Sequence, residues 1–169
     1  TPPPFDLLYW NSDSTNLPGP FYAWYLRNMY LENKLVKPGA LTVCGEKIDL
    51  GQVRLPAYIY GSREDHIVPW KAAYASTGVL KGVKDQTFVL GASGHIAGVI
   101  NPAAKNKRSH WVNTQRPADA DAWFDTATEK PGSWWPVWSD WLSTHGGRQV
   151  AAPKAYGNRQ YKVIEPAPG

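Results

Sequence analysis

The sequence predicts an α/β fold in which two parallel strands are joined by a helix. An apolar run at 55–60 is followed by a helical segment at about 69–79 and by a second apolar run at 86–90. Gly61 and Gly91 mark the carboxyl ends of the two strands. Because a crossover helix returns the chain to the same edge of the sheet, the strands run parallel. We therefore expect a mostly parallel sheet flanked by helices.

The residues before this unit predict a more irregular region. Residues 1–19 are rich in Pro, Asn, Ser and Asp and predict an irregular loop. Residues 20–33 predict a helix with Pro20 in its first turn, and most of its surface is apolar, so we expect it to be covered on several sides. Residues 41–44 predict a short strand, and a turn or hairpin follows at 45–51.

Beyond the second strand, residues 101–121 are polar and predict a surface excursion, and 121–129 predict a short helix. Ser133 is expected to cap a last helix that has Pro136 in its first turn and stops at 146–147. This helix would pack one face of indoles, because the spacing is helical at Trp134, Trp138 and Trp141. The tail from Ala151 shows no periodicity.

Composition excludes several classes of protein. The 169 residues are 43% hydrophobic and 19% charged, which is enough to bury a core and argues against disorder. The net charge is +4, but the basic residues are scattered along the sequence and no nucleic-acid-binding motif accompanies them, so we expect no nucleic-acid partner. Cys44 is the single cysteine, so a disulfide within the chain is impossible and a reducing compartment is expected. Neither a signal-peptide pattern nor a transmembrane stretch is present in this sequence.

Two titratable side chains follow the predicted parallel strands. Asp65 lies just beyond the first strand and His95 just beyond the second. In open α/β sheets, functional groups gather at the carboxyl ends of the strands. The order acid then base also matches the last two members of an α/β-hydrolase triad. In that arrangement the carboxylate orients the imidazole, and the imidazole takes the proton of the nucleophile.

The nucleophile is not evident. Residues 91–95 partly resemble a Gly-x-Ser-x-Gly elbow around Ser93, but His95 replaces the last glycine and no helical pattern follows. Cys44 precedes the acid, as a nucleophile should, but lacks the flanking glycine and helix, and would otherwise be a buried small hydrophobe. Since an α/β hydrolase needs roughly 250 residues, we expect the nucleophile upstream of Thr1.

His66 beside Asp65 invites a metal-site interpretation. No further ligands accompany the pair, and a structural zinc site wants four. No metal is therefore expected, and His66 is predicted to bond nearby backbone or to join the network of the site.

Longer motifs resemble a known family. Residues 58–70 (YIYGSREDHIVPW) and 88–102 (FVLGASGHIAGVINP) resemble the acid-bearing and histidine-bearing segments of class I polyhydroxyalkanoate synthases. Shorter matches occur at 11–19 (NSDSTNLPG), 132–136 (GSWWP) and 164–169 (IEPAPG). The resemblance covers nearly the whole chain.

This resemblance implies an α/β-hydrolase fold, with residues 1–56 in a cap subdomain and 57–169 in the C-terminal part of the core. It implies that Asp65 and His95 are the acid and base beside a cysteine carried by the N-terminal part of the same enzyme. The substrate would be a 3-hydroxyacyl-CoA such as 3-hydroxybutyryl-CoA, and the products polyester and free coenzyme A, with no separate cofactor. Members work as cytoplasmic homodimers on polyester granules.

A thiolate attacking a thioester gives an acyl-enzyme of similar energy, which suits chain transfer. His95 or Asp65 could then take the proton of the incoming hydroxyl. Ile96 and Ala97 follow the base directly, so we predict that they line the acyl pocket.

Two rival functions remain. An esterase or depolymerase of the same fold would share the acid and base, and its nucleophile would be a serine. An aromatic-rich, non-enzymatic binding module would account for the nine Trp residues, although the spacing of the last-helix indoles favours packing.

Overall fold

The structure is a computed structural model and describes residues 6–165. Four strands form one sheet in the order β3-β4-β5-β6, with bounds Ala57–Ser62, Gln86–Gly91, Ser109–Val112 and Thr128–Pro131. The β3–β4 pair is parallel, whereas β4–β5 and β5–β6 are antiparallel. The predicted parallel pair is confirmed. In this part of the chain, however, the sheet is mixed and not mostly parallel.

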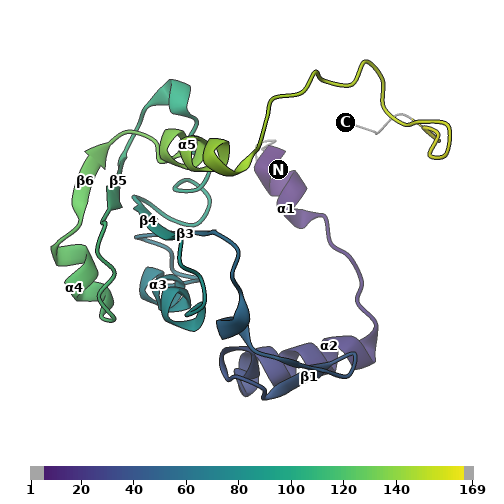
Figure 1. Cartoon of the computed structure of the whole chain (residues 1–169), viewed down its shortest axis with the longest axis horizontal. Coiled ribbons are helices and arrows are strands. Elements are labelled where there is room, and N and C mark those ends of the chain that lie inside the picture. The colour runs from purple at the N-terminus through teal and green to yellow at the C-terminus, as the bar shows by residue number, and fades with distance from the viewer. Residues whose placement is uncertain (1–5, 166–169) are drawn as a thin grey trace, which may run out of the picture.

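Helices cover both faces of the sheet (Figure 1). Helix α3 (Trp70–Val79) is the crossover between β3 and β4 and lies on one face, and α5 (Trp135–His145) lies on the other. Successive strand residues point to opposite faces. Tyr60 therefore packs against Trp134 at the start of α5 in a tilted arrangement, with ring centroids 4.3 Å apart, while its neighbour Gly61 faces Ala73 of α3.

The core lies on the α3 face. Its buried members are Tyr74, Phe88, Leu90, Trp111 and Trp123. Trp123 of α4 (Ala120–Asp125) is fully buried and meets Phe88 edge to face at 4.9 Å. Each such ring contributes roughly 1.5–3 kcal/mol by leaving water. The core therefore holds β3, β4 and β5 in place beneath the loops that carry Asp65 and His95.

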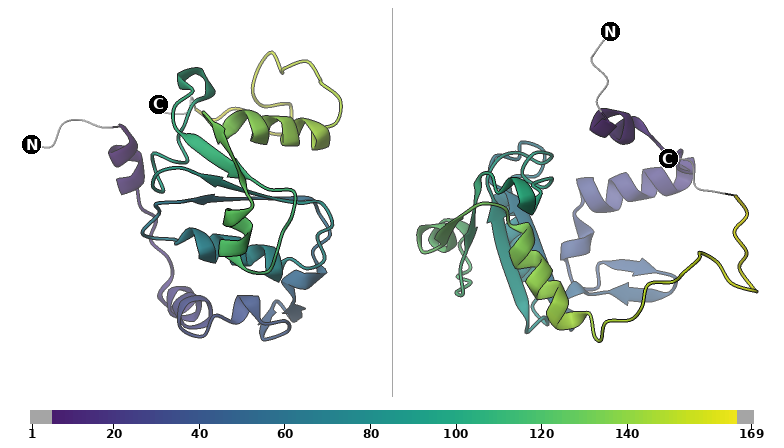
Figure 2. Two further views of the ribbon diagram at one scale, coloured as in Figure 1. Left: turned by 90° about the vertical axis from the view of Figure 1, so that its left-hand side faces the viewer. Right: turned by 90° about the horizontal axis from the view of Figure 1, so that it is seen from above.

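The N-terminal region forms a separate lobe beside the sheet (Figure 2). Its elements are α2 (Gly19–Tyr25), the π-helix η1 (Leu26–Leu31), the 3-10 turns η2 (Lys34–Val36) and η3 (Leu50–Gln52), and the hairpin strands β1 (Leu41–Val43) and β2 (Glu46–Ile48). Helix α1 (Asp6–Ser12) lies apart from these elements, at the far end of an extended stretch (Figure 1). The prediction of a helix at 20–33 and of a hairpin is confirmed. The prediction of an irregular loop at 1–19 is wrong where α1 forms; residues 1–5 lie outside the described part.

The continuous helix formed by α2 and η1 is largely uncovered by the rest of the described chain, whereas its apolar surface predicted cover on several sides. Phe21, Tyr22, Tyr30 and Leu31 are about half exposed or more. Asn28 is the buried residue instead, because its amide donates to the Trp24 carbonyl and accepts from the Lys34 ammonium. The buried side of this helix is therefore marked by local hydrogen bonds of Asn28, which the hydrophobic periodicity of the sequence does not predict.

Three further expectations changed. The polar stretch 101–121 contains strand β5, and the predicted helix at 121–129 ends at Asp125 and gives way to β6. Helix α5 is confirmed, but its N-cap position is Trp134 and not Ser133; the Ser133 hydroxyl, one residue earlier, still accepts the Trp135 N–H at 3.1 Å. Its indole face is only partly packed, since Trp134 is buried and Trp138 is 38% exposed.

After α5 the described tail has no helix or strand and runs away from the sheet (Figure 1). Among residues 6–165, no helix is both long and apolar enough to cross a bilayer.

Candidate functional site

The loops that follow β3 and β4 are joined by backbone hydrogen bonds. The Arg63 N–H donates to the Gly91 carbonyl at 2.8 Å, and the Glu64 N–H donates to the Ser93 carbonyl at 3.1 Å. These bonds continue the parallel pairing past the ends of the strands. The two residues that follow them, Asp65 and His95, are therefore brought to one place at the edge of the sheet.

The Asp65 carboxylate and the His95 imidazole face each other at this edge. Asp65 Oδ1 lies 3.6 Å from His95 Nδ1, and the side chains are 10% and 35% exposed. This separation is slightly longer than a hydrogen bond. Catalytic contacts are often long in ligand-free proteins and shorten when substrate binds. The arrangement can therefore act as an oriented acid–base pair.

The carboxylate of Asp65 is held by its own loop. Its Oδ1 accepts the N–H of Ile67 at 2.8 Å and of Val68 at 3.0 Å. The bond from Val68 is the largest cause that lowers the pKa of Asp65, and desolvation opposes it. The bond from Ile67 and the nearby charges of His95 and His66 lower the pKa further. Asp65 is therefore ionised at neutral pH.

The other predicted site residues lie around His95. The exposed His66 ring meets the His95 ring edge to face, with centroids 5.2 Å apart. Ile96 and Ala97 are exposed in the turn that follows His95. Within the described range 6–165, no three His, Cys, Asp or Glu side chains gather in a way that could hold a metal ion.

Comparison with curated proteins decides the family. The chain is 62% identical over all 169 residues to the poly(3-hydroxyalkanoate) polymerase subunit PhaC of Cupriavidus necator and covers 28% of it. It is 45% identical over 168 residues to PhaC of Rhizobium meliloti, covering 99% of this chain and 27% of the relative. It is 41% identical over 169 residues, its full length, to poly(3-hydroxyalkanoate) polymerase 2 of Ectopseudomonas oleovorans and covers 30% of it. The chain belongs to the poly(3-hydroxyalkanoate) polymerase family. No protein-family model matches it.

The chain spans less than a third of the length of these relatives, and the match lies in their C-terminal part. The family resemblance seen in the motifs around Asp65 and His95 is therefore confirmed over the whole sequence. The name of the relatives concerns the complete proteins.

Neither nucleophile candidate within the polymerase chain sits on a strand-to-helix elbow. Cys44 is exposed, not buried as its type suggested, and occupies the β1–β2 turn with Gly45, at φ values of 52° and 86°. Two such residues make a type I′ hairpin turn. Ser93 has a φ of 76°, but turns and not a helix follow it. Its carbonyl helps to join the two site loops.

The sequence did not reveal the role of Arg63, two residues before the acid. Its guanidinium lies 4.9 Å from the ring centroid of Trp111 and 4.7 Å from that of Phe124. Cation–π contacts of this kind attach the Asp65 loop to β5 and α4. The sequence shows only that an arginine lies between the end of the strand and the Asp65 carboxylate, and this does not indicate which rings it contacts.

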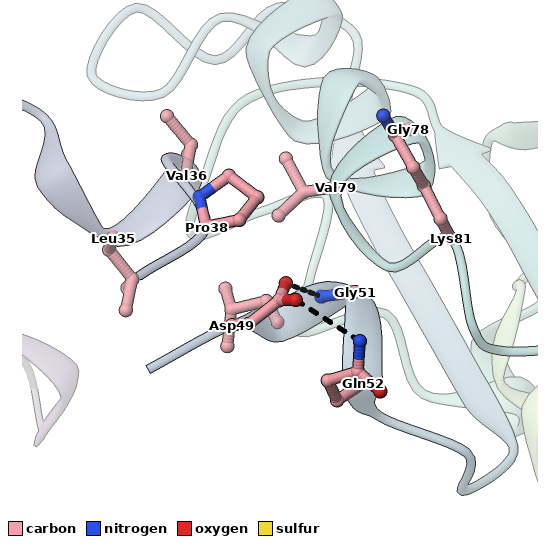
Figure 3. A pocket seen from close by; sticks show the side chains of 10 residues that line it. Leu35, Val36, Pro38, Asp49, Gly51, Gln52, Gly78, Val79 and Lys81 are labelled. Atoms are coloured by element: carbon pink, nitrogen blue, oxygen red, sulfur yellow. Dashed lines mark hydrogen bonds between the residues drawn. The ribbon is translucent and has the colours of Figure 1, made fainter. Parts of the chain in front are cut away.

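A cavity of about 320 Å³ lies elsewhere, between the N-terminal lobe and the carboxyl end of α3 (Figure 3). Val36 and Pro38 line one side, and Val79 and Lys81 line the other. The Asp49 carboxylate is occupied, because it accepts the Gly51 N–H and the Gln52 amide. The end of α3 precedes β4, so this cavity lies at the opposite edge of the sheet from His95.

Proposed function

We propose that Asp65 and His95 are the acid and the base of an acyl-transfer site in a longer poly(3-hydroxyalkanoate) polymerase. The observation that carries this proposal is their meeting at the ends of consecutive parallel strands, with His95 Nδ1 facing the carboxylate at 3.6 Å. Functional groups of α/β proteins gather at this edge. The names of the relatives supply the reaction class.

The pair has the electrostatics that a general base requires. Since Asp65 is ionised and faces Nδ1, the neutral imidazole of His95 carries its proton on Nδ1 and keeps Nε2 as the acceptor. The carboxylate also stabilises the imidazolium that forms during the reaction. No metal is required for these steps.

The nucleophile in this proposal is a cysteine outside the present chain. His95 Nε2 takes the thiol proton as sulfur bonds to the thioester carbonyl of a 3-hydroxyacyl-CoA, and coenzyme A leaves with that proton. The 3-hydroxyl of the next unit then attacks the acyl-cysteine and loses its proton to His95 or Asp65. The ester bond forms, and the cysteine sulfur is the leaving group. Coenzyme A is part of the substrate, and no cofactor takes part.

The proposal includes the larger architecture. Residues 57–169 form the C-terminal part of an α/β-hydrolase core, and residues 1–56 belong to a cap. The cavity between η2–η3 and the end of α3 is consistent with two parts, because residues 35–52 line one side of it and residues 78–81 line the other. The exposed aromatic side chains of α2 and η1 support burial against the rest of the polymerase, a second copy of it, or a polyester granule.

The test uses the complete polymerase with 3-hydroxybutyryl-CoA, following coenzyme A release and polymer yield together. His95→Gln should lower kcat about 10²–10⁴-fold, as loss of a general base does. His145→Gln is the matched control, because His145 forms the other Asp–His pair, 3.3 Å from Asp85. A His95→Gln enzyme within tenfold of the parent would overturn the proposal. Coenzyme A release that yields free 3-hydroxy acid instead of polymer would favour the hydrolase.

A further inference from the structure

The turn that carries His95 is held by the start of α5. The Trp134 indole N–H donates to the Gly98 carbonyl at 3.1 Å, and the Trp135 indole N–H donates to the Val99 carbonyl at 2.9 Å. The Ser133 hydroxyl donates to the Asn101 carbonyl. Three consecutive side chains thus bond three carbonyls of one short segment, more than 30 residues away in the sequence.

The bonds from Ser133 and Trp134 are buried, and the bond from Trp135 is partly buried. Ser133, Trp134 and Asn101 are each less than a tenth exposed. Buried carbonyls left without donors cost about 1–3 kcal/mol each, so the turn has a strong preference for this arrangement. A Cβ on Gly98 would lie 2.7 Å from two carbonyl oxygens, so the backbone of the turn packs closely here and has no room for a larger residue.

The same indole contacts the strand that leads to the acid. The Trp134 ring packs at a tilt against Tyr60 of β3, with centroids 4.3 Å apart, and its N–H donates to the turn that carries His95. Tyr60 lies five residues before Asp65. Trp134 therefore connects the strand of the acid to the turn of the base, and it can fix the distance between them.

The His95 ring itself has few restraints. In the described chain, the His95 ring faces the Asp65 carboxylate at 3.6 Å and contacts the His66 ring edge to face. Its orientation therefore depends on the backbone of the turn, in which the Gly98 N–H bonds the Gly94 carbonyl and the Ile100 N–H bonds the Ile96 carbonyl.

We propose that Trp134 and Trp135 are positioning residues, whose indole N–H groups set the distance between His95 and Asp65 in the polymerase reaction. This inference rests on the proposed function. A misplacement of about 1 Å at a reacting group costs on the order of 10²-fold in rate. The effect falls on kcat, because neither indole N–H is available to substrate while it bonds the turn.

The experiment uses Trp134→Phe and Trp135→Phe in the complete polymerase. Each keeps an aromatic ring and removes the indole donor, but also makes the side chain smaller, so the control must lose the same volume. Trp141→Phe is the matched control, because Trp141 is an indole of the same helix whose buried N–H has no partner in the described chain. We expect kcat to fall roughly 10–100-fold for each test variant, with KM changed less than about threefold, and the control to match the parent.

Two readouts separate positioning from stability. The histidine-ring NMR signal that His95→Gln removes should move in Trp134→Phe and stay in place in Trp141→Phe. In a double-mutant cycle, Trp134→Phe should cost little once Asp65→Asn is present, because both changes disturb one pair. Test variants that match the control per folded molecule, or fully additive losses, would overturn the inference. If Asp65→Asn and His95→Gln are themselves active, the proposed function fails instead.

Discussion

Replacing Asp65 by Asn and by Ala separates the two roles that the structure gives this carboxylate. Oδ1 accepts two backbone N–H groups, and the negative charge faces His95. Asn keeps an acceptor oxygen for both N–H groups but lacks the charge, whereas Ala lacks both. Activity should therefore fall alike in the two variants, while stability should differ between them.

The magnitudes follow from these contacts. A hydrogen bond to a charged group is worth about 1.5–3 kcal/mol and a neutral one about 0.5–1.5. In Asp65→Asn both bonds change from charged to neutral acceptors. Because Ile67 and Val68 are more than half exposed, solvent screens the difference, and the free energy of unfolding should fall by about 1 kcal/mol. Ala loses both bonds and should cost about 1–2 kcal/mol more. Turnover should fall about 10³–10⁴-fold in both, as for a base that loses its orienting carboxylate.

The stabilisation that the Asp65 carboxylate provides should depend on pH in a predictable direction. Folding lowers the pKa of Asp65, so its contribution to stability is present above the unfolded value, about 3.9, and disappears as pH falls through the folded value. The stability difference between parent and Asp65→Asn, from urea unfolding, should therefore be full at pH 6 and vanish in the acid range. An Asn variant with more than a tenth of parental kcat/KM would refute the orienting role. A pH-independent difference would refute the charge argument.

Four further changes test other contacts. Gly98→Ala should destabilise the protein by about 1–3 kcal/mol, because the new methyl lies 2.7 Å from two carbonyl oxygens; an unchanged urea midpoint would contradict this geometry. Arg63→Gln removes two cation–π contacts and should cost about 1 kcal/mol and lower kcat more than it raises KM; a pure KM effect would instead place Arg63 at the substrate. Trp123→Ala should cost about 3–5 kcal/mol, measured by denaturant unfolding, since the indole is fully buried; a smaller loss than Gly98→Ala causes would be inconsistent with this core. Ala97→Leu should shift the preferred acyl side-chain length, measured with 3-hydroxyacyl-CoA substrates of different lengths, and unchanged selectivity would remove Ala97 from the pocket.

The sequence revealed the part of the fold whose signals are local. The β3–α3–β4 unit was predictable, because apolar runs between Gly and Pro residues specify both strands and the crossover requires them to be parallel. That was enough to bring Asp65 and His95 to the same edge. Strand β5 was not predictable, because only four residues form it and their pairing with β4 determines it. A short strand of this kind has no periodicity of its own.

The contacts that set the finer geometry were also invisible in the sequence. The motif around Trp134 reads as a helix start and gives no sign that its indoles reach carbonyls 36 residues earlier. Arg63 reads as a loop residue, yet it lies against two rings brought there by β5 and α4. Side chains that stabilise a site through long-range contacts leave no spacing pattern, because their partners are chosen by tertiary packing.

Burial within the chain shows where the site geometry originates. Nearly all buried side chains of the described residues lie between β3 and the start of α5, and Asn28 and Leu41 are the exceptions in the N-terminal lobe. The loops of Asp65 and His95 belong to this well-packed region. By contrast, Trp10 of α1 and Tyr156 of the tail are each more than 70% exposed. The Asp65–His95 pair is therefore positioned by the sheet and its core, whereas the N-terminal helices and the tail expose apolar side chains that this chain does not cover. The Cupriavidus necator relative is more than three times as long as this chain, and under the proposed function the rest of such a polypeptide supplies the nucleophile and covers this apolar surface.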